Sequence, residues 1–115
     1  MKSHRIERIC KLIRRHITEL IHREIKDPRI GFVTITDVES SPDLQNIKVF
    51  FSVLGDDKAK KKATLGLKSA TGYIRREIGH RVKLRFTPAI HFKLDESIER
   101  AVRITSLLDS VKENV

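Results

Sequence analysis

The segment DKAKKKATLGLKSATGYIRREIG, at residues 57–79, decides the fold. Its apolar side chains recur every three or four residues, which is the spacing that collects them on one face of a helix. Gly66 and Gly72 interrupt this pattern, and a glycine inside a helix costs about 1 kcal/mol relative to alanine. Gly72 also follows three small residues, SAT at 69–71. We therefore expect two helices with a break or kink near residues 70–72.

Strands are predicted on both sides of this helical region. Residues 32–39 (FVTITDVE) are rich in β-branched side chains, and apolar positions alternate through residues 47–54. The SSPD sequence between them, at 40–43, is typical of a turn, so the two strands should form an antiparallel hairpin. Alternation returns at residues 89–94, which predicts a third strand with a short extended lead-in over 82–86.

Amphipathic helices are predicted at both ends of the chain. Residues 3–25 have apolar positions at helical spacing and are followed by Pro28, and residues 97–111 show the same spacing. The order is therefore α-β-β-α-α-β-α, and three strands with helices on one face form an α+β sandwich. Its β-α-α-β unit is the core arrangement of a KH domain, a single-stranded RNA-binding fold. We expect a KH-like RNA-binding domain over residues 1–95 and a C-terminal helix or tail over residues 96–115.

Positive charge dominates the chain and is unevenly placed. The 115 residues carry a net charge of +9, from 24 Lys and Arg against 15 Asp and Glu. Residues 58–93 hold 11 basic groups and 1 acidic group, whereas residues 27–57 hold 2 basic and 6 acidic groups. Such segregation favours a polyanionic partner over a merely solvated surface. No apolar run approaches the roughly 20 residues of a membrane span, so we expect a cytoplasmic protein without a membrane partner.

Catalytic and metal sites find little support in the sequence. None of the 5 histidines forms the i, i+4 pair of a helical metal site, and Cys10 lies on the apolar stripe of the first helix. The single cysteine excludes an internal disulfide and a multi-cysteine zinc site. Asp37, Glu39 and Asp43 cluster around the hairpin, where strand-end and turn chemistry explains them. We expect a protein that is not an enzyme and uses no cofactor.

The strongest candidate site is the basic region around the predicted helical break. A backbone with small side chains lets another backbone approach closely, and flanking cations can hold phosphates whatever the base sequence. The alternative is that Gly72 only lets two helices pack tightly. The predicted RNA-binding residues are Lys60, Lys61, Lys68, Ala70, Thr71, Gly72, Arg75, Arg76, Arg81 and Arg85. With 5 Phe, 1 Tyr and no Trp, base stacking on exposed rings is expected to contribute little.

Two alternatives remain open at this stage. The polar face of the first helix is as consistent with a solvated surface as with RNA contact; its basic residues are Arg5, Arg8, Lys11, Arg14 and Arg15. The chain could also be a basic protein-docking module that uses its first or last helix, or a general nucleic-acid-binding protein. Salt separates these functions, because RNA binding should collapse between low and moderate salt and apolar docking should not.

Five segments, in order along the chain, resemble the ribosome-binding factor A family. They are DPRIGFVTIT at 27–36, SPDL at 41–44 with FFSVLG at 50–55, ATGYIR at 70–75, LRFTP at 84–88 with HF at 91–92, and DESI at 95–98. The likeness covers essentially the whole chain. It is specific because the five motifs occur together and in order.

The resemblance implies a type II KH-like fold in which Ala-x-Gly, here Ala70-Thr71-Gly72, stands where other KH domains have Gly-x-x-Gly. It also implies an assembly factor that binds the free small ribosomal subunit and its rRNA late in maturation. Assistance to rRNA processing near the 5′ end, support of growth in the cold and assembly GTPases as partners are implied as well. We further expect a monomer with a loosely attached C-terminal helix.

Overall fold

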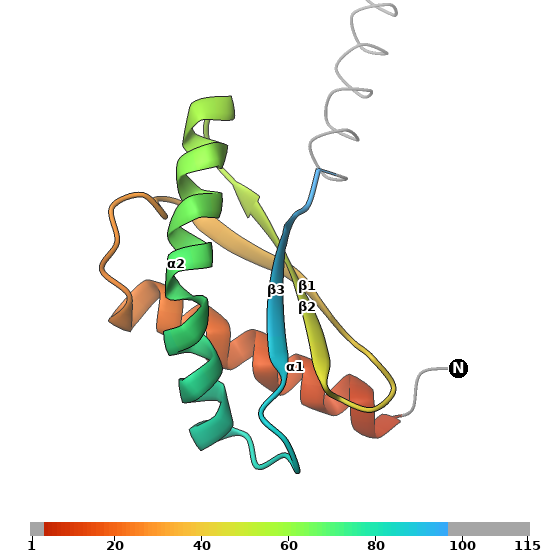
Figure 1. Ribbon diagram of the computed structural model, residues 1–115. Coiled ribbons are helices and arrows are strands. Elements are labelled where there is room, and N and C mark those ends of the chain that lie inside the picture. Colours follow the sequence, from red (N-terminus) through yellow and green to blue (C-terminus); the bar gives the residue numbers. More distant parts are fainter. Residues whose placement is uncertain (1–3, 97–115) are drawn as a thin grey trace, which may run out of the picture.

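Residues 4–96 are described by a computed structural model, which has two long helices beside a three-stranded sheet (Figure 1). The predicted α+β class, with helices packed on one face of the sheet, is confirmed. The helix predicted over 97–111 lies outside the described residues, so the division of the chain near residue 95 stays a prediction. Within the described part, no helix has both the length and the apolar surface that a membrane crossing requires.

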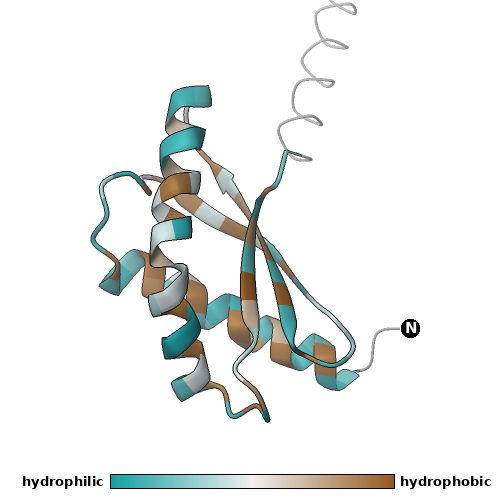
Figure 2. Ribbon diagram, in the orientation of Figure 1, coloured by the Kyte–Doolittle hydropathy of each residue, from teal (hydrophilic) through white to brown (hydrophobic). Residues whose placement is uncertain are grey.

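The N-terminal helix, α1 (His4–Glu19), carries one stripe of apolar side chains that packs against the sheet. Cys10, Ile13 and Ile17 are buried in this stripe, as their helical spacing predicts. One turn of π-helix, η1 (Leu20–Glu24), continues the same helical segment. In Figure 2 hydrophobic and hydrophilic positions alternate along α1, as expected of a helix with one covered face.

The sheet contains β1 (Val33–Ser40), β2 (Asn46–Val53) and β3 (Ala89–Leu94), in that spatial order. β1 and β2 form the predicted antiparallel hairpin, and β3 lies parallel to β2. The strand bounds agree with the predicted ranges to within one residue at each end. A register shift at Thr36 is a β-bulge, which turns Val38 back to the buried face.

One face of the sheet is covered by helices, and the other is left open by the described residues. Ile47, Val49 and Phe51 of β2 are fully buried, whereas Lys48 between them is exposed. This alternation is the period of two expected of a strand with one buried face. Because α1 packs on β1 and α2 packs on β3, the two helices lie in one layer and contact each other (Figure 1).

Helix α2 (Asp57–Arg81) connects β2 to β3 without interruption. This corrects the expectation of two helices with a break or kink near residues 70–72, because one helix spans these residues. The physical reason is that burial of Leu67 and Ile74, each worth about 1.5–3 kcal/mol, outweighs the cost of about 1 kcal/mol for a helical glycine. The helix begins at a conventional cap, because the Asp56 carboxylate accepts a hydrogen bond from a backbone N–H in the first turn.

A tight turn at residues 27–30 leads from η1 toward β1. The Asp27 carboxylate accepts a hydrogen bond from the backbone N–H of Arg29 at 2.9 Å and pairs with the Arg29 guanidinium at 2.7 Å. These contacts hold the pKa of Asp27 below its ordinary value, chiefly through the side-chain hydrogen bond from Arg29. Ile30 then enters the core and packs beside Gly66 of α2. The Asp-Pro-Arg motif therefore positions the chain for the start of the sheet.

Candidate nucleic-acid interface

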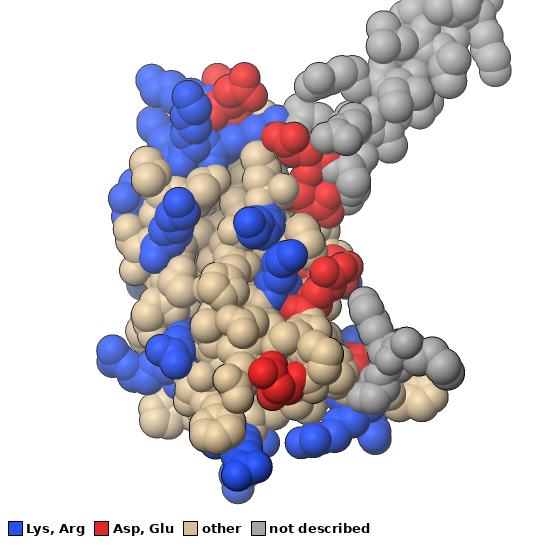
Figure 3. All heavy atoms as spheres, turned by 45° about the vertical axis from the view of Figure 1, so that its right-hand side comes forward, with Lys and Arg blue, Asp and Glu red and all other residues tan. Residues whose placement is uncertain are grey.

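The solvent-facing side of α2 carries a line of basic residues. Lys61, Lys68 and Arg76 are exposed, and their spacing places them on one face of the helix together with exposed Gly72. We call these four residues the basic stripe. At 1.5 Å per residue it extends about 22 Å along the helix axis. Figure 3 shows Lys and Arg at intervals down the left side of the molecule, the side on which α2 lies in Figure 1.

Gly72 forms a bare position in the middle of the basic stripe. Within the described part of the chain, a Cβ built at Gly72 would meet no neighbouring atom within 4 Å, whereas one built at Gly66 would lie 2.8 Å from Ile30 Cγ1. Close packing therefore occurs at Gly66, and the alternative that Gly72 exists to let two helices pack finds no support. Lys68 and Arg76 stand one helical turn on either side of Gly72. A ligand backbone that approaches Gly72 would lie between two cations.

Ala70 and Thr71, which precede Gly72, contribute less surface. Both are half-buried, and Ala70 packs against the core. The Thr71 hydroxyl donates to the carbonyl of Leu67 at 2.9 Å. Its hydrogen-bonding capacity is thus partly used within the helix, and RNA contact by these two residues stays a prediction.

Arg75 holds the loop that follows α2. Its Nε donates to the carbonyl of Pro88 at 3.1 Å, and Nη2 donates to the carbonyl of Thr87 at 3.2 Å. These bonds hold the end of the loop against the helix. The short lead-in expected over 82–86 does not form a strand. The geometry gives Arg75 a role in loop positioning that its sequence pattern did not reveal.

Arg81 lies in an ion-pair network with three carboxylates. Its guanidinium nitrogens are 2.8 Å from Glu24, 3.5 Å from Glu77 and 3.8 Å from Glu19. The Tyr73 hydroxyl also donates to Glu24 at 2.6 Å, and this bond, ahead of Arg81, holds the pKa of Glu24 below its ordinary value. The charge of Arg81 is therefore balanced locally, because the fold brings Glu19 and Glu24 to the end of α2.

Lys60 and Arg85 stand at opposite ends of α2. Lys60 is half-buried in the first turn and lines a surface depression together with exposed Phe32 and Leu54. Arg85 lies in the loop after α2, with its guanidinium carbon 5.4 Å from the centroid of the Phe86 ring. Of the ten predicted residues, Lys61, Lys68, Gly72 and Arg76 thus lie together in one stripe. The other six lie beside this stripe or make contacts within the protein.

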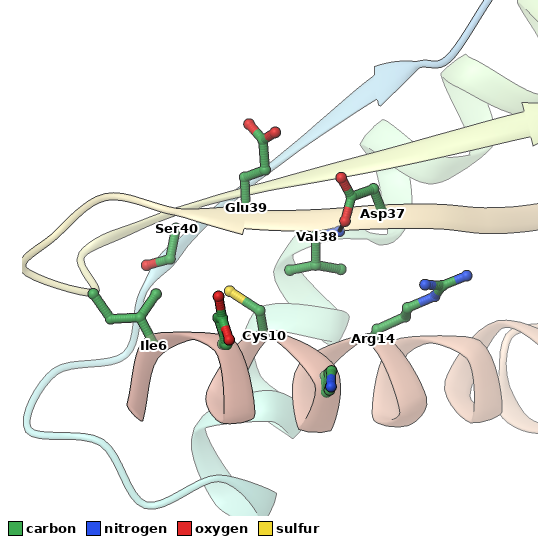
Figure 4. A pocket seen from close by; sticks show the side chains of 9 residues that line it. Ile6, Cys10, Arg14, Asp37, Val38, Glu39 and Ser40 are labelled. Atoms are coloured by element: carbon green, nitrogen blue, oxygen red, sulfur yellow. Dashed lines mark hydrogen bonds between the residues drawn. The ribbon is translucent and has the colours of Figure 1, made fainter. Parts of the chain in front are cut away.

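Three of the side chains considered for catalysis line one groove. Cys10, Asp37 and Glu39 border a depression of about 200 Å³ between α1 and β1, and the Glu39 side chain extends away from Cys10 (Figure 4). Asp37 accepts a hydrogen bond from the backbone N–H of Val38 at 2.8 Å. Among residues 4–96 no group of three or more His, Cys, Asp or Glu side chains could hold a metal ion.

Comparison with known proteins indicates the family to which this chain is related. The family model described as Ribosome-binding factor A matches residues 5–108. The chain is 52% identical over 113 residues to the Ribosome-binding factor A of Halothermothrix orenii. The aligned region covers 98% of this chain and 93% of that protein. The solution structure of a candidate ribosome binding factor A from Thermotoga maritima is similar with a TM-score of 0.74 and 30% identity, covering 86% of this chain and 94% of that one.

The fold is also similar to that of Thermus thermophilus ribosome binding factor A, in a homology model fitted into a cryo-EM map of its complex with 30S. Its TM-score is 0.60 at 21% identity, covering 84% of this chain and 97% of that one, which shows a shared fold. The family model spans most of the chain, and the match to the Halothermothrix orenii protein extends over nearly the full length of both. The chain therefore belongs to the ribosome-binding factor A family.

Proposed function

We propose that this protein binds the free small ribosomal subunit late in its maturation and contacts the rRNA backbone through the basic stripe. Family membership supports this function, as does the 30S complex in which the Thermus thermophilus protein has been placed. The protein would assist rRNA processing near the 5′ end, support growth in the cold, and act as a monomer alongside assembly GTPases. Its site of action would be the cytoplasm, where ribosomal subunits are assembled.

The observation that carries the proposal is the bare backbone at Gly72 between Lys68 and Arg76. Within residues 4–96 neither cation is engaged in an ion pair or hydrogen bond, so both are available to phosphates. Phosphate contacts supply affinity without reading sequence. Binding would favour one rRNA conformation through its higher affinity for the protein, and no catalytic step is needed.

Charge reversal tests the placement of the interface. Arg76→Glu should weaken co-sedimentation with small subunits several-fold at moderate salt, and each lost phosphate contact should reduce the salt dependence by about 0.7–0.9 in logarithmic slope. Lys93→Glu is the matched control, because it makes the same charge change at an exposed position on the open face of the sheet. Equal losses for the two variants would indicate a general charge effect and would contradict the proposed interface.

A steric variant tests the bare position itself. Gly72→Ala places a methyl group where the ligand backbone would approach, yet this methyl meets no neighbouring atom within 4 Å in residues 4–96. We expect weaker binding to small subunits from a fully folded protein. Unchanged binding would show that the rRNA backbone does not approach α2 at this point.

A protein-docking function is the second candidate, and one observation favours it. Phe32 and Leu54 are 78% and 79% exposed and lie together near the start of α2. Exposed apolar patches of this kind often mark protein contacts. The apolar stripe of α1, by contrast, is buried and cannot serve as a docking face. Binding that survives the change from low to moderate salt would favour this candidate.

A further inference from the structure

A second surface feature lies beyond the C-terminal end of α2. It is a depression of about 270 Å³ between the start of α1, the turn joining β1 to β2, and the loop after α2. Arg5, Asp43, Gln45, Arg85 and Phe86 are among the residues that line it. They come from three separate segments of the chain, so only the tertiary structure brings them together.

The Phe86 ring is presented to solvent at the edge of this depression. It is 54% exposed, and the Arg85 guanidinium lies over the ring at 5.4 Å from its centroid. The backbone that follows Phe86 in the chain is fixed, because Arg75 donates hydrogen bonds to the carbonyls of Thr87 and Pro88. An exposed ring on a fixed backbone can stack on a nucleobase with little loss of conformational entropy.

The polar groups of the depression match the other parts of a nucleotide. Arg5 and Arg85 supply positive charge for phosphates. Asp43 accepts hydrogen bonds from the Ser41 hydroxyl at 2.6 Å and the Gln45 N–H at 3.1 Å, and both bonds go to Oδ1. Oδ2 takes part in neither of these two bonds and can accept a hydrogen bond from an amino group of a base.

The loop that lines the depression packs against α2 near the end of the basic stripe. Gly79 lies one turn beyond Arg76 toward the end of α2, and a Cβ built there would be 3.0 Å from the Thr87 hydroxyl. The loop that carries Phe86 is thus packed directly against the helix at this point. An RNA strand that followed the basic stripe toward the end of α2 would reach the depression.

We propose that this depression binds one unpaired nucleotide of an RNA strand. The base stacks on Phe86 and Arg85, phosphates pair with Arg5 and Arg85, and an amino group of the base donates to Asp43. The nucleotide must be unpaired, because a base inside a duplex cannot present its face to a protein ring. This inference rests on the proposed rRNA-binding function and adds a base contact that the phosphate contacts along α2 do not provide.

Intrinsic fluorescence provides a direct test, because the chain has no Trp. Phe86→Trp places a single tryptophan at the proposed stacking position. Phe32→Trp places one at a more exposed phenylalanine, 78% exposed, just before β1 and thus at the other end of the hairpin. Titration with a single-stranded heptacytidylate should quench the tryptophan of Phe86→Trp and leave that of Phe32→Trp unchanged.

Affinity measurements complete the test, with binding of the same labelled RNA followed by fluorescence anisotropy. Phe86→Leu should weaken binding by about fivefold or more, the lower end expected for loss of one base–aromatic stack, whereas Phe32→Leu should have little effect. Heptauridylate should bind more weakly than heptacytidylate, because uracil lacks the amino group from which Asp43 would accept a hydrogen bond. Equal affinities for the two RNAs would overturn the role given to Asp43.

The results distinguish failure of this inference from failure of the proposed function. If the wild type binds RNA and small subunits but Phe86→Trp is not quenched, the nucleotide site is wrong and the proposed interface along α2 stands. Equal quenching of the two tryptophan variants would also overturn the site, because stacking would not be localised at Phe86. If the wild type binds neither RNA nor small subunits, the proposed function fails and this inference fails with it.

Discussion

Alanine substitutions at the two glycines of α2 test its geometry most directly. Gly72→Ala adds a methyl group in open space, so the gain in helix propensity should raise the free energy of unfolding by about 1 kcal/mol. Gly66→Ala brings the same gain, but its Cβ would lie 2.8 Å from Ile30 Cγ1 and 3.4 Å from Ile30 N. Such overpacking typically costs about 1–3 kcal/mol, so the net effect is a loss of about 0–2 kcal/mol.

The comparison of the two variants is sharper than either value alone. Because the propensity gain is common to both, it cancels, and Gly72→Ala should be more stable than Gly66→Ala by about 1–3 kcal/mol. Urea unfolding followed by far-UV circular dichroism measures this difference, provided that the slope m is the same for both proteins. The thermal midpoints should differ by about 4 °C or more.

Two outcomes would refute the reasoning. A Gly72→Ala protein less stable than the wild type would show that residue 72 is not helical and that the chain does break there. Equal stability of the two variants would show that the turn at residues 27–30 does not pack tightly against Gly66. Each outcome contradicts a different part of the structure, so the experiment tests the continuity of α2 and its contact with the turn separately.

Two further predictions concern contacts at the C-terminal end of α2. Because the pKa of Glu24 is lowered in the folded protein, its contribution to stability is present above its ordinary value of 4.5 and is lost as the pH falls through the folded value. Tyr73→Phe removes the main cause of the shift, so acid urea titrations should show a smaller stability loss than in the wild type; an identical loss would contradict the network. Arg75→Gln should speed amide exchange in residues 83–87, whereas Arg76→Gln should not, and equal rates would contradict the loop contact.

The local pattern of the sequence was sufficient for most of the fold. Strand bounds followed from the alternation of apolar residues, since one covered face imposes a period of two on each strand. The stripe of α1 followed from helical spacing, and the hairpin followed from the turn residues at 40–43. The region of positive charge around residues 58–93 also predicted a polyanion-binding surface, and its location stays a prediction.

The state of α2 depended on packing that no local pattern reveals. A glycine weakens a helix by about the same amount wherever it occurs, so Gly66 and Gly72 looked alike in the sequence. Burial of Leu67 and Ile74 keeps the helix continuous, and the approach of Ile30 makes Gly66 the packing glycine. The sequence alone therefore predicted a break where the structure has an exposed helical residue.

The chemical role of each basic residue was likewise decided by its distant neighbours. Sequence by itself determined the strands, the stripe of α1, the α+β class and the segregated positive charge, because these follow from local periodicity and composition. Tertiary structure alone decided that Arg81 pairs with Glu19 and Glu24, that Arg75 holds the loop after α2, and that Arg76 has no ion pair among residues 4–96. The physical reason is that an ion pair requires two groups within a few ångströms, and for residues this far apart in the chain only the fold sets that distance.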